Sequence, residues 1–281
     1  MKHLVLGSAG QIGDHLVTYL KKQNQDVFEY DIINSKNEDL RIYNSKLEDL
    51  IKNCDFIYFL AFDVGGAKYL EKYQHSYKFI SNNLKIMTNT FELIKKYKKP
   101  FIFASSQMSE ISHSTYGLLK LIGERTTQSL NGIVARFWNV YGYERDEEKS
   151  HVITDFIKMA KYDGVIKMRT DGEESRQFLH ADDCSECLFI LSKKYYSIEK
   201  QLPIHVTNFK WTKIIEIAKY IQSISECKII VNNKKDQTQK NAMNKPNKNI
   251  LNYWKPKTSL VEGINKLYKH IKNENISSYS V

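Results

Sequence analysis

Short apolar runs alternate with longer amphipathic stretches along the first half of the chain, and this alternation restricts the fold more than any other feature. The runs have the length of β-strands and occupy residues 3–6, 27–30, 56–60, 101–104 and 133–137. Between them, apolar side chains recur at helical spacing over residues 12–22, 77–97 and 115–130. Strands that alternate with helices are typical of a parallel sheet. The sequence therefore predicts an α/β fold with a Rossmann-type, doubly wound parallel sheet.

A glycine-rich turn joins the first predicted strand to the first predicted helix, with the sequence Gly7-Ser8-Ala9-Gly10-Gln11-Ile12-Gly13. Glycines there let the backbone approach a pyrophosphate, because no side chain stands in the way. The N-terminus of the following helix offers free N–H groups and the positive end of the helix dipole. This context indicates a dinucleotide site. The expected cofactor contacts are Gly7, Gly10, Gln11, Ile12 and Gly13.

An acidic residue, Asp31, follows the second predicted strand. A carboxylate at this place accepts hydrogen bonds from the adenosine ribose hydroxyls and repels a 2′-phosphate. It therefore favours NAD over NADP as the cofactor. The alternative is an ordinary aspartate in a turn.

A tyrosine and a lysine lie one turn apart at the start of a predicted helix, in the sequence Tyr116-Gly-Leu-Leu-Lys120. An ammonium group near a phenol stabilises the phenolate and lowers the pKa of the tyrosine. Such a tyrosine takes a proton from an alcohol while a hydride leaves to NAD. Ser106 follows a buried strand, where its hydroxyl is placed to hydrogen-bond the substrate oxygen. An exposed helical pair is the alternative for Tyr116 and Lys120.

The alternation of predicted strands and helices becomes irregular after about residue 139. A polar stretch rich in Lys and Asn from 232 to 249 predicts a loop. We therefore expect residues 1–140 to form the NAD-binding domain. Residues 141–281 are expected to form a smaller, partly interleaved domain that binds the substrate.

The net charge of +10 raises the possibility of a nucleic-acid binder. The lysines are scattered, however, and no motif of basic and aromatic residues organises them. We therefore expect no nucleic-acid partner. A strongly salt-dependent binding curve would be needed to revive that alternative.

The sequence also predicts neither a membrane segment nor a metal site. No apolar run approaches the ~20 residues of a membrane helix, and the N-terminus lacks the anatomy of a signal peptide. Cys184 and Cys187 form a C-x-x-C without a second ligand pair, which favours two ordinary helix positions over zinc. A cytoplasmic protein with reduced thiols is expected.

Three further motifs follow in order along the chain. They are Arg136-Phe-Trp-Asn139-Val-Tyr-Gly142, Arg176-Gln-Phe-Leu-His-Ala-Asp182-Asp183 and Trp254-Lys-Pro256-Lys-Thr-Ser-Leu-Val-Glu262-Gly263. Together with the glycine turn and the Tyr-Lys pair, they resemble the extended short-chain dehydrogenase/reductase superfamily, in particular its NAD-dependent epimerase/dehydratase group. The resemblance runs nearly end to end and implies a nucleotide-diphosphate sugar as the substrate.

The resemblance implies more contacts to NAD than the glycine turn alone provides. Asp39-Leu40 resembles a pair that contacts the adenine, and Leu60-Ala61 resembles a pair beside the cofactor. Asn83 matches an asparagine on a family helix. Lys120 would also bind the ribose.

The resemblance also implies the substrate contacts. Asn139 would contact the sugar nucleotide and Arg176 would grip the diphosphate, while Ser106 and Gln107 would lie against the sugar. Val64-Gly65-Gly66 resembles a segment of enzymes that act on GDP-sugars, which favours a GDP-hexose or GDP-heptose over a mere flexible turn. The helices at 77–97 and 115–130 match the pair that forms the four-helix homodimer interface of the family.

Departures from the family pattern restrict the reaction. Gln107 and Met108 stand where 4,6-dehydratases carry an Asp-Glu pair, so dehydration is not expected. Asp31 disfavours an NADPH-dependent ketosugar reductase. The expected activity is oxidation at C4, by an epimerase or a 4-dehydrogenase of surface polysaccharide biosynthesis. A ketosugar reductase and a non-catalytic NAD-binding sensor remain alternatives. The short gap from Ser106 to Tyr116 implies a sugar pocket that is more open or is closed by another segment.

Overall fold

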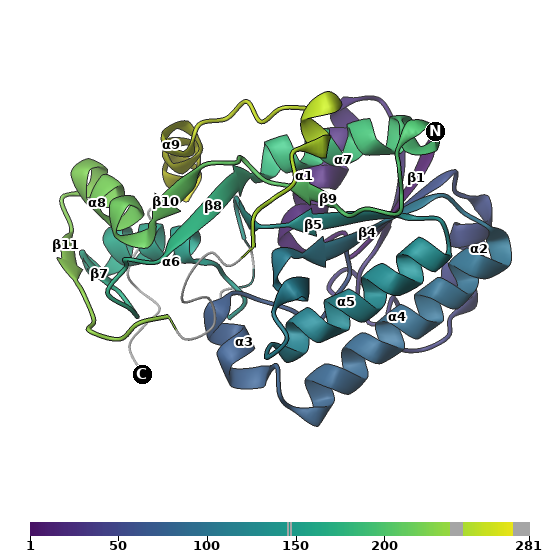
Figure 1. The fold of residues 1–281 in the computed structure, drawn as a ribbon, viewed down its shortest axis with the longest axis horizontal. Coiled ribbons are helices and arrows are strands. Elements are labelled where there is room, and N and C mark those ends of the chain that lie inside the picture. Colours follow the sequence, from purple (N-terminus) through teal and green to yellow (C-terminus); the bar gives the residue numbers. More distant parts are fainter. Residues whose placement is uncertain (145, 147, 237–243, 272–281) are drawn as a thin grey trace.

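The computed structural model describes residues 1–144, 146, 148–236 and 244–271, which form a larger and a smaller lobe (Figure 1). A parallel sheet of six strands forms the centre of the larger lobe. Its strands are β1 (Lys2–Leu6), β2 (Asp26–Tyr30), β3 (Phe56–Phe59), β4 (Phe101–Ser106), β5 (Ile133–Phe137) and β9 (Ile204–Val206). They lie in the order β2-β1-β3-β4-β5-β9, and each neighbouring pair is parallel. The predicted α/β fold with a Rossmann-type sheet is confirmed.

Helices cover both faces of this sheet (Figure 1). On one face, α1 (Gln11–Lys22) and α7 (Ala181–Lys193) pack into one apolar core. On the other face, α2 (Ser45–Asn53), α4 (Tyr77–Tyr97) and α5 (Thr115–Ser129) pack into a second core. Strands covered on both faces need nearly continuous apolar sequence, and all residues of β3 and β5 are buried. This explains why the short apolar runs were visible in the sequence.

The strand order reverses direction at β1, which pairs with β2 on one side and β3 on the other. Ligands of open α/β sheets bind outside the carboxyl ends of the strands at such a switch point. The glycine turn after β1 and the Leu60-Ala61 pair after β3 lie at this point. The fold therefore places the predicted cofactor residues where a dinucleotide binds.

The smaller lobe is built on short strands and three helices. The strands β6 (Asn139–Tyr141), β8 (Ser175–His180) and β10 (Trp211–Lys213) form one sheet, and β7 (Val165–Lys167) pairs with β11 (Lys228–Ile230). The helices are α6 (Val152–Lys158), α8 (Ile214–Ser225) and α9 (Leu260–His270). A third apolar core holds these elements together. Because β9 and α7 belong to the larger lobe, the two parts are interleaved across residue 140.

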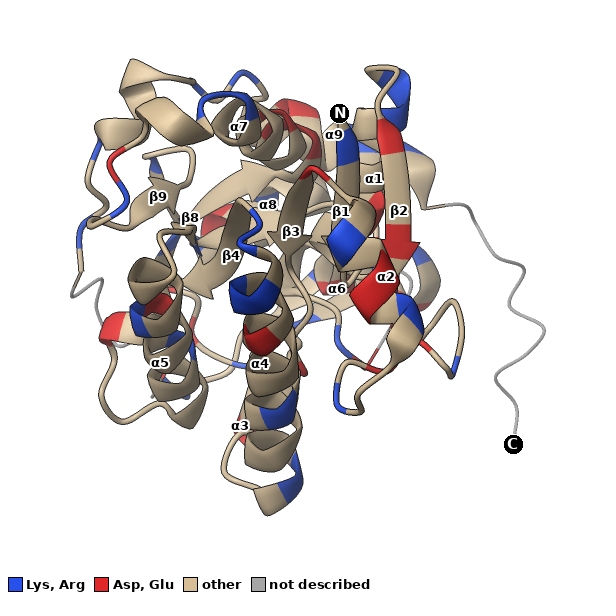
Figure 2. Ribbon diagram, turned by 90° about the vertical axis from the view of Figure 1, so that its right-hand side faces the viewer, with Lys and Arg blue, Asp and Glu red and all other residues tan. Residues whose placement is uncertain are grey.

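The remaining elements are short. They are α3 (Ala67–Tyr73), the single turns at Gln107–Glu110, Tyr195–Ser197 and Asn249–Asn252, and a π-helical turn at Met159–Asp163. In the described part of the polar stretch, residues 232–236 and 244–248 form neither helix nor strand. None of the helices among the described residues has the length and apolarity of a membrane-spanning helix. In the view of Figure 2, basic and acidic residues alternate over the helices and loops rather than forming a basic stripe.

Candidate active site

The glycine turn has the geometry of a phosphate-binding loop. Gly7 has a φ of +86°, and a Cβ there would lie 2.7 Å from the Ala61 nitrogen, so β1 and β3 approach closely. A Cβ on Gly13 would overlap the Gly7 carbonyl oxygen, whereas at Gly10 the nearest atom is 3.4 Å away. Gly10 caps α1 without a side-chain hydrogen bond, so backbone N–H groups are presented to the loop. These features fit the pyrophosphate of a dinucleotide.

Two glycine substitutions distinguish packing from phosphate access. Gly13→Ala is expected to lower the free energy of unfolding by about 3 kcal/mol, because its methyl group overlaps backbone. Gly10→Ala is expected to cost less than about 1 kcal/mol, because a Cβ there meets only the Gly7 carbonyl oxygen at 3.4 Å. It should nevertheless weaken NAD binding, because the methyl group would occupy space in the loop that the pyrophosphate needs. Urea denaturation without NAD and titration with NAD measure the two effects. If the two variants lose the same amount of stability, Gly13 is not required for packing more than Gly10 is.

Asp31 follows β2 and lies directly beside the glycine turn. One carboxylate oxygen accepts the N–H of Ala9 at 3.0 Å, and the other accepts the N–H of Ile33 at 2.9 Å. The side chain of Asn34 donates to the Ser8 hydroxyl at 3.2 Å, which ties the same two segments together. Asp31 is therefore in the predicted place, and its contact with the ribose stays a prediction.

The other predicted cofactor residues have structural partners. Asn83 is fully buried and holds the segment after β3, since its side chain accepts the Asp63 N–H at 2.7 Å and donates to the Asp63 carbonyl at 3.1 Å. The Asp39 carboxylate pairs with Arg41, whose hydrogen bonds lower the pKa of Asp39. Leu40 is buried. The structure brings Gln11 close to the smaller lobe, where its side chain donates to the Val140 carbonyl at 3.2 Å.

Ser106, Tyr116 and Lys120 come together at the end of β4. Ser106 is the last residue of β4, and Tyr116 and Lys120 occupy the first two turns of α5. The Ser106 side chain lies close enough to the Tyr116 phenol to offset part of the rise that burial causes in its pKa, and the Lys120 ammonium lies 5.8 Å from the centre of the Tyr116 ring. The predicted catalytic residues are therefore adjacent, and they are buried.

The predicted direction of the Tyr116 pKa is wrong for the ligand-free chain. Burial raises the pKa of Tyr116 to about 12, and the Ser106 hydrogen bond opposes this increase only in part. Lys120 donates to the Ala104 carbonyl at 2.6 Å, and burial lowers the pKa of Lys120 to about 7, with Glu124 opposing. The sequence showed the spacing of the pair but not its burial. A general base here needs nearby positive charge that offsets the effect of burial on Tyr116.

Predicted substrate residues from three separate segments meet in one pocket between the lobes. Its lining consists of Gln107, Trp138, Asn139, Ser175, Arg176, Trp211 and Asn244. Arg176 forms an ion pair with Asp236 and also donates to the Ser175 carbonyl at 2.8 Å. Asn139 donates to the Gln177 carbonyl at 3.3 Å. Of these lining residues, Gln107 directly follows Ser106 in the sequence.

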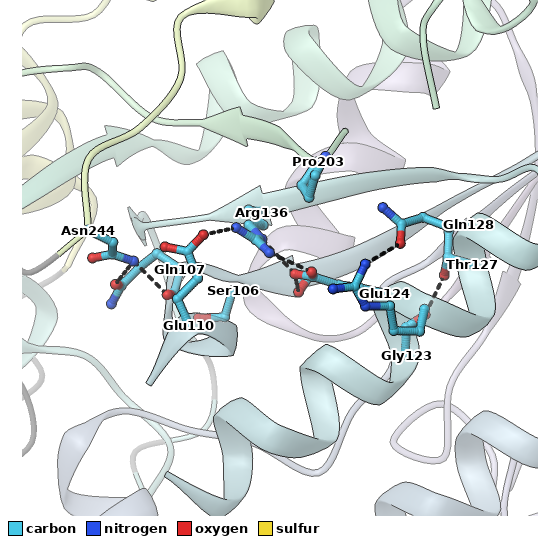
Figure 3. Close-up of polar contacts among 12 residues, drawn as sticks. Ser106, Gln107, Glu110, Gly123, Glu124, Thr127, Gln128, Arg136, Pro203 and Asn244 are labelled. Carbon is cyan, nitrogen blue, oxygen red and sulfur yellow. Dashed lines mark hydrogen bonds and ion pairs between the residues drawn. The ribbon is translucent and has the colours of Figure 1, made fainter. Parts of the chain in front are cut away.

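The short connection from Ser106 to Tyr116 is tightly fixed. Gly117 packs against the Met108 carbonyl so closely that a Cβ would overlap it. Asn244 donates to the carbonyl of Gln107 at 2.8 Å and to its side-chain oxygen at 3.0 Å (Figure 3). A segment near the C-terminus therefore closes this side of the pocket, in agreement with one of the two expectations for the short gap.

The Val64-Gly65-Gly66 segment has a packing explanation. A Cβ on Gly65 would lie 2.8 Å from the Cβ of Tyr69, and one on Gly66 would overlap the Ser150 carbonyl. Both glycines are buried, and Val64 is partly buried against the core. The two glycines are thus required by the approach of residues 149–150, and their contact with a sugar stays a prediction.

A buried ionic network that sequence reasoning missed joins β5 to α5 (Figure 3). Arg136 on β5 forms a two-pronged ion pair with Glu124 on α5, with both N–O distances at 2.7 Å. The Ser105 hydroxyl donates to Glu124 at 2.6 Å, and Glu110 also pairs with Arg136. Glu124 lies one helical turn beyond Lys120, and this spacing was the sequence signal that could have identified Glu124 as part of the site. No local signal identified Trp211 or Asn244, which reach the pocket only through tertiary folding.

Comparisons with known proteins agree with this geometry. The model of the NAD dependent epimerase/dehydratase family matches residues 3–207. UDP-glucuronic acid decarboxylase 6 of Arabidopsis thaliana is 25% identical, with 94% of this chain and 87% of the relative covered. A UDP-glucose 4-epimerase of Thermotoga maritima, solved with UDP-glucose, has a TM-score of 0.81 at 19% identity, covering 96% and 98% of the two chains. A GDP-6-OMe-4-keto-L-xylo-heptose reductase of C. jejuni also scores 0.81, at 17% identity, covering 96% and 97%.

The family match spans both the glycine turn and the Tyr116-Lys120 pair and reaches into the smaller lobe. The two solved structures show the same fold over nearly the whole chain. The sequence motifs, the site geometry and the comparisons therefore agree. The chain belongs to the NAD-dependent epimerase/dehydratase family of extended short-chain dehydrogenases/reductases, whose cofactor is NAD.

Proposed function

We propose that this protein uses NAD to oxidise C4 of a nucleotide-linked sugar, as an epimerase or as a 4-dehydrogenase. One observation carries the proposal. Ser106, whose side chain partly offsets the effect of burial on the pKa of Tyr116, immediately precedes Gln107, and Gln107 lines a pocket with Arg176. The serine of the catalytic group is thus one residue away from a small cavity that contains a guanidinium group suited to a diphosphate.

The residues divide the work as follows. Arg176 binds the diphosphate in place of its present partner Asp236. Ser106 hydrogen-bonds the sugar oxygen, and Tyr116 removes the proton from that oxygen. NAD, when bound, takes up the hydride from the sugar carbon. Lys120 supplies positive charge near Tyr116 and thereby favours the phenolate.

Two observations restrict the reaction. Gln107 and Met108 carry no group that acts as an acid or base, which disfavours dehydration. Asp31 sits beside the glycine turn, where its charge disfavours the 2′-phosphate of NADP. Retention of the keto product until the hydride returns gives an epimerase, and its release gives a dehydrogenase.

More specifically, we propose that the substrate is a GDP-hexose or GDP-heptose. The product would serve surface polysaccharide biosynthesis, and the enzyme would work in the cytoplasm. The heptose-reductase neighbour acts on a GDP-sugar by its name, whereas the epimerase neighbour holds UDP-glucose. Buried free cysteines suit a reducing compartment. Packing alone accounts for Gly65 and Gly66, so these glycines do not distinguish a GDP-sugar from a UDP-sugar. A panel of nucleotide sugars distinguishes the two bases.

The test is a panel of nucleotide sugars mixed with the NAD-loaded protein. The panel contains UDP-glucose, UDP-glucuronic acid, a GDP-hexose and a GDP-heptose. Rising NADH absorbance with a keto sugar indicates a dehydrogenase, and altered sugar stereochemistry without net NADH indicates an epimerase. NAD binding without change in any sugar would contradict the proposal and favour a sensor.

We also propose that the chain forms a homodimer through α4 and α5, which lie side by side (Figure 1). Their outer face exposes Tyr77 and Leu84 on α4, and Leu118 and Ile122 on α5. Leu118 and Ile122 are one turn apart, so they form a continuous apolar strip. A second copy of the same pair of helices is the partner that such a self-complementary face fits.

Charge in this strip is expected to separate the dimer. The double substitution Leu118→Glu and Ile122→Glu places four carboxylates in the centre of the symmetric interface, so the mass measured by light scattering should fall to that of a monomer. Val261→Glu on α9 is the matched control, since Val261 is exposed to the same 51% as Ile122. A monomeric unsubstituted protein, or a double variant that stays dimeric, would contradict the proposed interface.

A further inference from the structure

Lys120 is an ammonium group buried in an apolar setting. Its side chain lies inside the larger lobe, and the residue is only 3% exposed. Among the described residues, no carboxylate lies within 4.0 Å of its ammonium nitrogen, although Glu124 acts on it from a greater distance. Burial of a charge is costly unless other groups compensate. The ammonium group therefore depends on partners other than an ion pair.

Two neutral groups fill that role. The Ala104 carbonyl accepts one N–H at 2.6 Å. The ring of Phe62 covers the ammonium group, with the nitrogen 3.7 Å from the ring centre. Phe103 is more distant, at 5.0 Å. The face of an aromatic ring carries negative charge density that attracts a cation, most strongly when water is excluded.

Phe62 contacts the other catalytic residue as well. Its ring meets that of Tyr116 edge to face, with the centres 5.8 Å apart and an interplanar angle of 76°. The backbone next to it is fixed, because Asn83 binds both the N–H and the carbonyl of Asp63. Phe62 is therefore held by the segment after β3 against both members of the pair.

We propose that Phe62 is a positioning residue: its ring holds the Lys120 ammonium group beside Tyr116 and keeps it charged. This inference rests on the proposed function of Tyr116 and Lys120. A ring is suited to this task because it attracts the cation without adding a net charge. A carboxylate in its place would cancel the positive potential of Lys120 at the phenol.

Few titratable groups lie near Lys120 among the described residues. On α5 they are Tyr116 and Glu124, and Glu124 is itself paired with Arg136 on β5. Asp63, next to Phe62, is bound by Tyr69 and Asn82. Substitution of Phe62 therefore changes the environment of Lys120 without removing an ionisable group.

The test measures the pKa of the Lys120 amine directly, in protein labelled with ¹⁵N-lysine. Its NMR signal is assigned by its loss in Lys120→Met, and the titration is done with and without NAD. Phe62→Leu is expected to lower the pKa by about one pH unit. Sugar oxidation at neutral pH should then fall about fivefold, in proportion to the charged fraction. Phe62→Tyr retains the ring face and should restore both values.

Two further variants separate the effect from loss of packing. Phe28→Leu removes an aromatic ring packed on the same core and should leave the pKa of Lys120 unchanged. Pentafluorophenylalanine at position 62 keeps the ring shape but reverses its charge distribution, so it should act like Phe62→Leu even if the latter folds poorly.

An unchanged Lys120 pKa in both the leucine and the fluorinated variants would overturn the proposal, as would a tyrosine variant that behaves like leucine. If the panel shows no sugar oxidation by the unsubstituted protein, the proposed function fails. The NMR titration still decides the role of Phe62 in that case, because it requires no substrate.

Discussion

Tyr116→Phe is expected to reduce the rate of sugar oxidation by about 10²–10⁴-fold, which is the range for removal of a general acid or base. The substitution removes the Tyr116 hydroxyl, which lies one helical turn from Lys120. Burial raises the pKa of this hydroxyl, and the Ser106 side chain opposes the increase in part. NAD affinity should change little, because the glycine turn and Asp31 are untouched. Steady-state rates with the preferred sugar and an NAD titration measure the two quantities.

Tyr97→Phe provides the control for this prediction. The Tyr97 hydroxyl also makes a hydrogen bond, to Glu48 at 2.7 Å, but it lies at the far end of α4. That variant should keep the unsubstituted rate. If Tyr116→Phe retains more than about a tenth of the rate, Tyr116 is not the proton acceptor.

Glu124→Ala is expected to lower the free energy of unfolding by about 3–5 kcal/mol, the cost of breaking a buried ion pair from one side. The Glu124 and Arg136 side chains are only 2% and 9% exposed. Loss of the carboxylate leaves the guanidinium group without its two-pronged partner and the Ser105 hydroxyl without its acceptor. Urea denaturation of the ligand-free protein measures the change.

Two variants control this measurement. Glu173→Ala removes an ion pair with Lys213 whose side chains are 62% and 47% exposed, and it should cost less than about 1 kcal/mol. The double variant Glu124→Leu and Arg136→Met removes both charges and should recover much of the lost stability. A Glu124→Ala protein as stable as Glu173→Ala would show that the buried pair is not required for folding.

Local sequence patterns were sufficient to predict β1 to β5 and the helices α1, α4 and α5 of the larger lobe, but not β9, α2 or α7. The strands β3, β4 and β5 are buried on both faces and therefore appear as apolar runs, and the range 77–97 coincides with α4. The glycine turn was also predictable, because Gly7 and Gly13 are needed by contacts within the turn and with β3. Tyr116 and Lys120 are neighbours along one helix, so their spacing alone places them together.

What the sequence did not predict depends on contacts between distant segments. The Tyr116 pKa is set by burial, which the spacing of a helical pair does not reveal. The role of Gly66 depends on Ser150, and the closure of the pocket depends on Asn244. Phe62 was likewise unremarkable in the sequence, since its importance arises from the position of Lys120 above its ring.

The central claim is that Tyr116 acts on a sugar held next to the nicotinamide of NAD. A crystal structure of the protein with bound NAD tests it most directly. The account predicts the nicotinamide ring at the carboxyl ends of β1 and β4, with the Tyr116 hydroxyl facing it across the space for a sugar carbon. A nicotinamide bound elsewhere, or a Tyr116 hydroxyl turned away from it, would contradict the account.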